Sequence, residues 1–451
     1  MPPLREDPES PIEGLAARLR ATGKVAAAGA RLAARRALGR EGDPDLALGE
    51  SIARELDRMK GIAMKAGQVL SYFEGMLPVS THEALRVLQT GVTAMPYPRV
   101  VEVLAEEFGR PPEELFESFE REPAAAASIG QVHRARFEGR DVAVKIQYPH
   151  LAETIEADFR RLRPFSRLVS LGTAVDGPGI ADDIAAHLAE ECDYRAEAAS
   201  QEWFREAWSD DPRIAIPAVV PERSSRRVLT TAWAEGDDFY AFAERAGEPE
   251  RHAAAATLLR FAFGSLFGLG RANADPHPGN YVFPPGAPRD APIVFLDFGC
   301  VHRFGAAFLE TERNLARAVL DDRPDEFRRR LDASGLVASP RGFDYDLQWR
   351  MQRLQYAPFG DPEFEYSTRF VREVMELSGP SNPNLRRLAV TDEWVWYQRL
   401  VWGLHAVLAR LGARGPFDEL FREMLDGASP ARRPAVPGDR PLDDASTRTE
   451  S

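Results

Sequence analysis

The sequence predicts an α+β fold with two lobes behind a helical N-terminal extension. Three observations point to it: an Ala- and Leu-rich helical pattern near the N-terminus, strand-like runs at 142–145 and 227–233, and a helical pattern from 305 to 320. We expect a helical extension over 1–120, a mixed N-lobe over 121–234, a helical C-lobe over 235–425, and a disordered Pro-, Arg- and Asp-rich tail over 426–451.

The extension carries a basic helical pattern in residues 12–40, which contain seven Arg or Lys residues and a single acidic residue, Glu13. Such a helix can lie on an anionic membrane surface. The alternative, a helix packed on the rest of the protein with its basic groups in water, stays open. The chain start lacks the order of a signal peptide, and no apolar run in the sequence approaches a membrane span. We therefore expect a cytoplasmic or peripheral membrane protein.

Lysine is rare in this chain, because only four of its 57 basic residues are Lys. Lys145 ends the strand-like run 142–145, where a compact ammonium suits contact with nucleotide phosphates better than the wide fork of Arg. The second strand-like run, 227–233, is expected to lead into the hinge between the lobes. The sequence thus predicts Lys145 as a phosphate-contacting residue of the N-lobe.

The segments DPHPGN and VFLDFG carry the clearest chemical signal. Asp275 and Asn280 stand five residues apart, which is the protein-kinase spacing between the Asp that accepts the substrate proton and the Asn that holds magnesium. Asp297 follows the apolar run 293–296 and matches the metal-binding Asp of DFG. We expect a protein-kinase-like fold that binds ATP or ADP with Mg²⁺ on Asn280 and Asp297, and Asp275 as the catalytic carboxylate.

Two differences from protein kinases limit the acceptor. The sequence has no APE motif, and the helical pattern from Gly305 starts a few residues after Gly299, which leaves little room for a peptide platform. Ala274 replaces the Arg of HRD, so control through that Arg by a phosphorylated loop is not available. A small molecule or water is the expected acceptor.

These residues together resemble the UbiB/ADCK-like, or aarF-domain, atypical kinases over residues 50–410, and within them the coenzyme-Q-linked branch. The resemblance rests on KxGQ, AAAS, VAVK, ExD, DPHPGN and DFG. It implies Mg-ATP binding and an ATPase or small-molecule role in quinone or isoprenoid lipid metabolism. It also implies that the nucleotide pocket and its mouth include Ala125, Ala126, Ala127, Ser128, Lys65, Gln68, Glu191 and Asp193.

The acidic residues between Ala185 and Ala199 lie on a helix-compatible stretch. Glu197 is our choice for the ion pair with Lys145, which would add it to the catalytic set, and Glu190 and Glu191 remain rivals. The chain departs from the family at position 273, which is Asn where His is usual. We expect the loop before Asp275 to be held differently as a result.

The composition of the chain limits which classes of partner it is expected to bind. The net charge of -13 argues against nucleic acid. The two cysteines, Cys192 and Cys300, are too few for a disulfide framework. The expected partners are a nucleotide, a lipid or quinone-precursor ligand, and an anionic membrane surface through residues 12–40; a homodimer is left open.

Three functional hypotheses remain. The first is an atypical kinase or ATPase. The second is a small-molecule phosphotransferase similar to aminoglycoside kinases, a family that lacks KxGQ and AAAS. The third is a nucleotide-dependent scaffold without turnover. We favour the first, because every catalytic side chain of the motif set is present.

Overall fold

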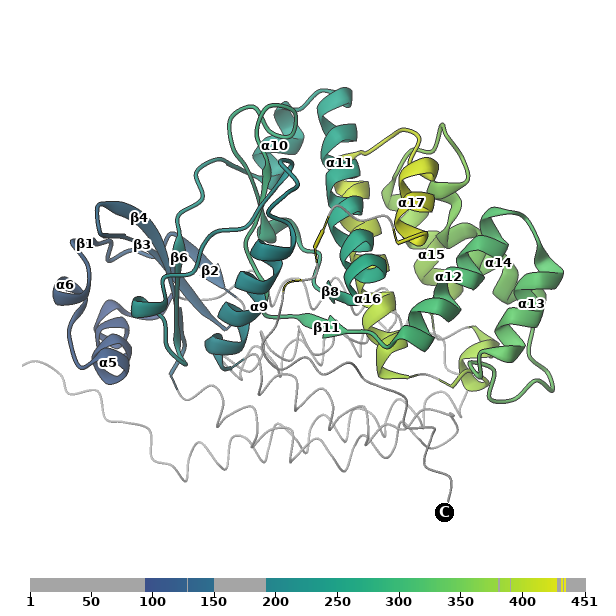
Figure 1. The fold of residues 1–451 in the computed structure, drawn as a ribbon, viewed down its shortest axis with the longest axis horizontal. Coiled ribbons are helices and arrows are strands. Elements are labelled where there is room, and N and C mark those ends of the chain that lie inside the picture. The colour runs from purple at the N-terminus through teal and green to yellow at the C-terminus, as the bar shows by residue number, and fades with distance from the viewer. Residues whose placement is uncertain are drawn as a thin grey trace, which may run out of the picture.

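The computed structural model describes residues 94–127, 129–149, 192–379, 382–389, 391–427, 431, 432 and 434. They form a small lobe built on one sheet and a larger, mainly helical lobe (Figure 1). This mixed two-lobed architecture confirms the predicted α+β class. Of the helical extension predicted over 1–120, residues 1–93, which include Lys65 and Gln68, lie outside the described residues.

The N-lobe sheet has the strand order β1-β3-β4-β6, with β2 paired to the same edge of β3 as β1. Its pairs are all antiparallel. The elements are α5 Tyr97–Phe108, α6 Pro112–Leu115, β1 Ser118–Phe119, β2 Ala125–Ala127, β3 Gly130–Phe137, β4 Arg140–Gln147 and β6 Val228–Ala232. The strands predicted at 142–145 and 227–233 are β4 and β6.

Local sequence explains the central hairpin. Glu138 and Gly139 join β3 to β4 with positive φ values of 50° and 70°, the conformation of the two-residue turn that fits twisted antiparallel strands. Val142, Val144 and Ile146 alternate along β4 and are at most 2% exposed. They share one core with side chains of α5 and α6. Both helices therefore pack with the N-lobe sheet, although they precede residue 121.

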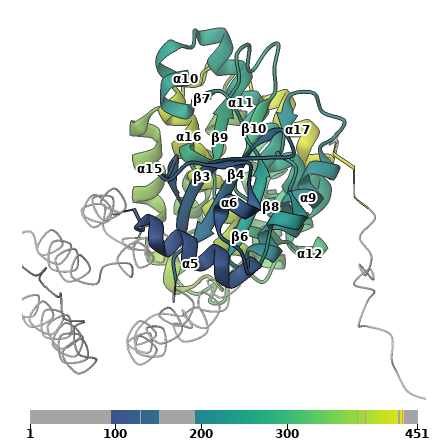
Figure 2. The same ribbon diagram turned by 90° about the vertical axis from the view of Figure 1, so that its left-hand side faces the viewer.

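The helix α9 Tyr194–Ala207 precedes β5 and β6 in the chain. The larger lobe holds two further sheets, ordered β5-β10-β9-β7 and β11-β8. Figure 2 shows the N-lobe sheet in front of this larger body. Its strands are β5 Ile214–Ala215, β7 Asp237–Asp238, β8 Arg271–Asn273, β9 Tyr281–Phe283, β10 Ile293–Phe295 and β11 Val301–Arg303. Its helices are α10 Phe239–Arg245, α11 Glu248–Phe263, α12 Ala306–Leu320, α13 Pro324–Ala333, α14 Tyr345–Gln355, α15 Thr368–Ser378, α16 Asp392–Leu411 and α17 Asp418–Leu425. Short 3₁₀ turns lie at Pro221–Arg223, Pro278–Asn280, Ala357–Phe359 and Pro383–Arg386.

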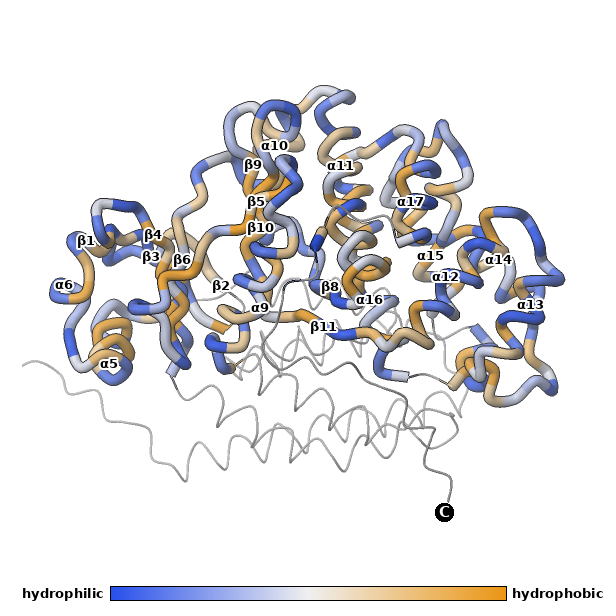
Figure 3. Tube along the Cα trace, viewed as in Figure 1, coloured by the Kyte–Doolittle hydropathy of each residue, from blue (hydrophilic) through white to orange (hydrophobic). Residues whose placement is uncertain are grey.

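The core of the C-lobe forms around α11, which continues into the π-helical segment Gly264–Leu269. Figure 3 shows the hydrophobic colouring concentrated along the strands β5, β6 and β10. Among the described residues, the stretch Glu248–Leu269 is long and apolar enough to cross a membrane, and 72% of its most apolar window is buried inside the protein. Its apolar surface is thus used in the C-lobe core.

Two local expectations are refined by the structure. Of the helix-compatible stretch 185–199, residues 185–191 lie outside the described residues; α9 begins at Tyr194, where Asp193 has an extended backbone and caps the helix. The helix expected from Gly305 to Leu320 is α12, with Gly305 as its N-cap.

Candidate active site

Two short antiparallel ladders bring the DPHPGN and DFG segments together. The DPHPGN loop, residues 275–280, runs from β8 to β9, whereas the DFG segment runs from β10 to β11. The strands on either side of one loop pair with the strands on either side of the other, because β8 pairs with β11 and β9 pairs with β10. This pairing holds the two loops side by side. The stretch between the two motifs contains the antiparallel β9–β10 pair.

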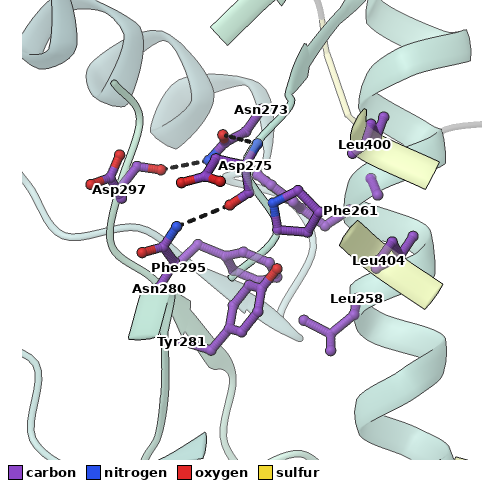
Figure 4. A pocket seen from close by; sticks show the side chains of 12 residues that line it. Leu258, Phe261, Asn273, Asp275, Asn280, Tyr281, Phe295, Asp297, Leu400 and Leu404 are labelled. Atoms are coloured by element: carbon purple, nitrogen blue, oxygen red, sulfur yellow. Dashed lines mark hydrogen bonds between the residues drawn. The ribbon is translucent and has the colours of Figure 1, made fainter. Parts of the chain in front are cut away.

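Side-chain amides fix the DPHPGN loop (Figure 4). Asn280 Nδ2 donates to the backbone oxygen of Asp275 at 3.0 Å. Asn273 Oδ1 accepts from the Asp275 N–H at 3.2 Å, and its Nδ2 donates to the backbone oxygen of Asp297 at 2.6 Å. Asn273 therefore links the two motif loops, and the Oδ1 end of Asn280 is the end that can bind a cation.

Lys145 connects the N-lobe to both carboxylates. Its Nζ donates to Glu197 Oε1 and Oε2 at 2.8 and 3.0 Å and to Asp297 Oδ2 at 3.2 Å. The Lys145 and Glu197 side chains are only 13% and 5% exposed. The structure thus pairs Lys145 with Glu197, in the first turn of α9, whereas the rivals Glu190 and Glu191 lie outside the described residues.

Burial and ion pairing oppose each other in this group. Burial would lower the pKa of Lys145, but the carboxylates of Asp297 and Glu197 raise it well above its usual value. Burial would raise the pKa of Asp297, but the Lys145 ammonium and the Gly299 N–H hold it below its usual range. That N–H donates to Asp297 Oδ1 at 2.9 Å. Lys145 and Asp297 are therefore charged near neutral pH.

The donor set fits magnesium held together with phosphates. Mg²⁺ prefers oxygen ligands and is commonly bound by one or two carboxylates plus substrate phosphates. Asp297 offers a carboxylate whose side chain is 29% exposed, and Asn280 offers an amide oxygen. In the part of the chain that the structure describes, no group of three or more His, Cys, Asp or Glu side chains could hold a metal ion. Phosphate oxygens would have to complete the coordination shell.

The remaining predicted residues differ in what the structure shows of them. Ala125 and Ala126 are exposed on β2, and Ala127 ends that strand; Ser128, Lys65, Gln68 and Glu191 lie outside the described residues. Asp193 accepts from the Arg195 N–H at 3.0 Å and pairs with its guanidinium at 2.6 Å. In the structure Asp193 is therefore a helix cap, and its place at the nucleotide pocket and its mouth stays a prediction.

Sequence reasoning missed one charged neighbour of the site. Arg399 Nη2 donates to Asp275 Oδ1 at 2.7 Å. The sequence itself gives no reason to connect this position with Asp275. The two residues are 124 positions apart.

A small cavity lies next to these groups. Its volume is about 20 Å³, close to that of one water-sized probe. Polar groups of Asn273, Asp275, Asn280 and Asp297 line one part of it (Figure 4). The rest is lined by Pro276, by Tyr281, and by apolar side chains from α11, β10 and α16: Leu258, Phe261, Ala262, Phe295, Leu400 and Leu404. Asp275 therefore stands between a polar cleft and an apolar wall.

Comparison with known proteins agrees with this geometry. A model of the ABC1 atypical kinase-like domain matches residues 87–325. Atypical kinase COQ8 from mitochondria of Saccharomyces cerevisiae is 28% identical, over 83% of this chain and 76% of its own length. Atypical kinase COQ8B from mitochondria of Rattus norvegicus is 33% identical, over 60% of this chain and 51% of its own length. This chain thus spans about half of the rat relative.

A solved structure also matches. The complex of Rv3197 with erythromycin from Mycobacterium tuberculosis superimposes with a TM-score of 0.62 at 28% identity, over 90% of this chain and 99% of the other. These matches confirm the resemblance and the kinase-like fold predicted from the sequence. The family model covers more than half of the chain and includes Lys145, Glu197 and both motif loops. The chain therefore belongs to the ABC1 atypical kinase-like family.

Proposed function

We propose that this protein is an ATP-dependent atypical kinase or ATPase that binds Mg-ATP between its lobes and transfers or hydrolyses the terminal phosphate. The observation that carries the proposal is the contact of Lys145 with Glu197 and Asp297, next to Asp275 and Asn280. An ammonium, an ionised carboxylate and an amide oxygen at one cleft are what phosphoryl transfer requires, since its catalysis is mostly positioning and charge stabilisation.

Each side chain has a distinct role in this proposal. Glu197 holds the Lys145 ammonium, which contacts the nucleotide phosphates. Asn280 and Asp297 hold magnesium, which when bound neutralises the charge that develops on the phosphates. Asp275 orients the attacking oxygen and accepts its proton. The third oxygen that contacts Lys145 Nζ is Asp297 Oδ2, at 3.2 Å. An oxygen of a bound phosphate would compete with it for the ammonium.

Several observations support a small acceptor or water. The helix α12 begins at Ala306, shortly after Gly299, so little chain is left for a peptide platform. The cavity beside Asp275 has room for one water-sized probe. Its apolar wall, and the resemblance to the coenzyme-Q-linked branch, support a role in quinone or isoprenoid lipid metabolism. Residues 12–40 would bring the site to an anionic membrane surface.

The test is magnesium-dependent phosphate release from ATP by the purified chain, with and without anionic liposomes. Asp275→Asn is the impaired control, and Asp290→Asn on an exposed loop is the matched surface control. We expect release by the unchanged chain and by Asp290→Asn, more of it with liposomes, and a residual rate on the order of 1000-fold lower by Asp275→Asn.

Other results would change the proposal. Release that liposomes leave unchanged removes the membrane part only. If the chain binds Mg-ATP but releases no phosphate under any condition, the protein is a nucleotide-dependent scaffold or a phosphotransferase that requires its own acceptor. Failure to bind Mg-ATP overturns the proposal.

A further inference from the structure

Arg399 contacts the DPHPGN loop at two neighbouring points. Its Nη2 donates to Asp275 Oδ1 at 2.7 Å, and its Nε donates to the backbone oxygen of Ala274 at 3.0 Å. Its side chain is 16% exposed, against 35% for that of Asp275. One planar guanidinium therefore fixes a carboxylate oxygen relative to the backbone that carries it, which a single-point cation cannot do.

The helix that carries Arg399 is itself fitted to the loop. Gly403, one turn further along α16, lies so close to Pro276 that a Cβ at this position would come within 2.7 Å of Pro276 Cγ. Near the start of the helix, Glu393 Oε1 accepts from the N–H of Gly305 at 2.6 Å. Thus α16 contacts the DPHPGN loop and also the segment that follows DFG.

We propose that Arg399 is the positioning residue for Asp275, and that α16 thereby sets the active geometry of the loop without a phosphorylated activation segment. The proposal rests on the proposed function. A bond to Oδ1 leaves Oδ2 as the oxygen that can accept a proton from water or a hydroxyl. The position before Asp275, where protein kinases carry an Arg, is Ala274, so the cation at this loop comes from a distant helix.

The rival explanation is that the ion pair only ties α16 to the loop. Such a tie contributes to folding stability, but it has no specific effect on the chemical step. The two explanations differ in a double-mutant cycle: a residue that acts through Asp275 loses its effect on turnover once Asp275 has been replaced, whereas independent effects add.

The experiment compares Arg399→Gln, Arg399→Lys, Asp275→Asn and the double variant, with Arg410→Gln on an exposed part of the same helix as the control. We expect kcat of Arg399→Gln to fall on the order of 100-fold, with Mg-ATP affinity unchanged within about twofold. Arg399→Lys recovers part of the loss, because it keeps the charge but not the fork. The double variant turns over no more slowly than Asp275→Asn, and Arg410→Gln behaves as the unchanged chain.

A second readout does not depend on turnover. Hydrogen exchange of the peptide that carries residues 271–281 should rise in Arg399→Gln and stay unchanged in Arg410→Gln, without a matching rise in the N-lobe sheet. Unaltered exchange of this peptide, or an additive double variant, overturns the positioning role. If the unchanged chain has no turnover but exchange of this peptide still rises in Arg399→Gln, the proposed function and the catalytic part of this inference are overturned. The contact between α16 and the loop then still holds.

Discussion

At the scale of single residues, the site depends on one ammonium shared by two carboxylates. Lys145 bonds both oxygens of Glu197 and one oxygen of Asp297, and the Gly299 N–H bonds the other oxygen of Asp297. The two carboxylates differ in accessibility, at 5% for Glu197 and 29% for Asp297. Glu197 is thus the buried anchor of the ammonium, and Asp297 is the carboxylate that a cation can reach.

We predict that Asp297→Asn abolishes magnesium-dependent ATP binding and leaves the fold intact. The amide has nearly the same shape but lacks the charge that a hard cation requires. Isothermal titration with ATP, with and without magnesium, measures the loss, and thermal unfolding checks the fold. Normal Mg-ATP affinity in this variant would contradict the metal assignment.

At the scale of elements, α12 contains an ionisable group that the site does not use. Glu312 is 5% exposed in the C-lobe core, near the hydroxyls of Tyr356 and Tyr397, which bond each other at 2.7 Å. No ion pair of Glu312 occurs among the described residues. Burial raises the pKa of Glu312 to about 8, so its protonated form is the one that the folded chain favours.

We predict that Glu312 makes the folded chain less stable as pH rises. Since its pKa is raised above the unfolded value of 4.5, its contribution to stability is complete below that value and is lost as pH rises through about 8. Glu312→Gln keeps the shape without the titration, so its melting temperature should fall less between about pH 6 and pH 8.5. If the melting temperatures of the two proteins fall equally with pH across this interval, other groups cause the pH dependence.

Packing of α16 on the DPHPGN loop yields a second prediction at this scale. In an open helix, Gly→Ala stabilises by about 1 kcal/mol. At Gly403 the new Cβ would meet the rigid ring of Pro276 at 2.7 Å, and such overpacking costs about 1–3 kcal/mol. We expect Gly403→Ala to lower both the melting temperature and turnover. An increase in melting temperature with normal turnover would show that the loop moves aside without cost.

At the scale of the whole molecule, the described lobes meet at the group around Lys145. Lys145 belongs to β4 of the N-lobe, and Asp297 follows β10 of the C-lobe. A ligand that binds both lobes should stabilise the folded chain by mass action, by about 2.7 kcal/mol at a concentration of 100 Kd. This effect gives a test of binding that does not require turnover.

We predict that Mg-ATP raises the melting temperature of the unchanged chain, whereas Lys145→Arg removes most of the rise. The fork of Arg replaces a point charge and cannot occupy the same space between two carboxylates. Thermal unfolding with and without Mg-ATP measures the difference. An equal rise in both proteins would mean that the nucleotide does not contact this side chain.

The sequence could predict the local parts of this protein. The runs at 142–145 and 227–233 specify β4 and β6 because β-branched and apolar residues suit a buried strand, and the spacing of Asp275 and Asn280 specifies a loop whose two ends serve one site. The alanine run at 125–127, whose propensity alone favours helix, is strand β2 in the structure because it pairs with β3. Backbone pairing overrides propensity at that position.

By itself, the sequence determined the family and the fold class, because residue type and short spacing carry that information, and it predicted the groups that the proposed chemistry requires. Only the tertiary structure decided which glutamate meets Lys145, that Asn273 joins the two motif loops, and that Arg399 holds Asp275. These contacts link positions from 24 to 124 residues apart. They depend on how strands pair and helices pack, and a linear pattern does not encode that arrangement.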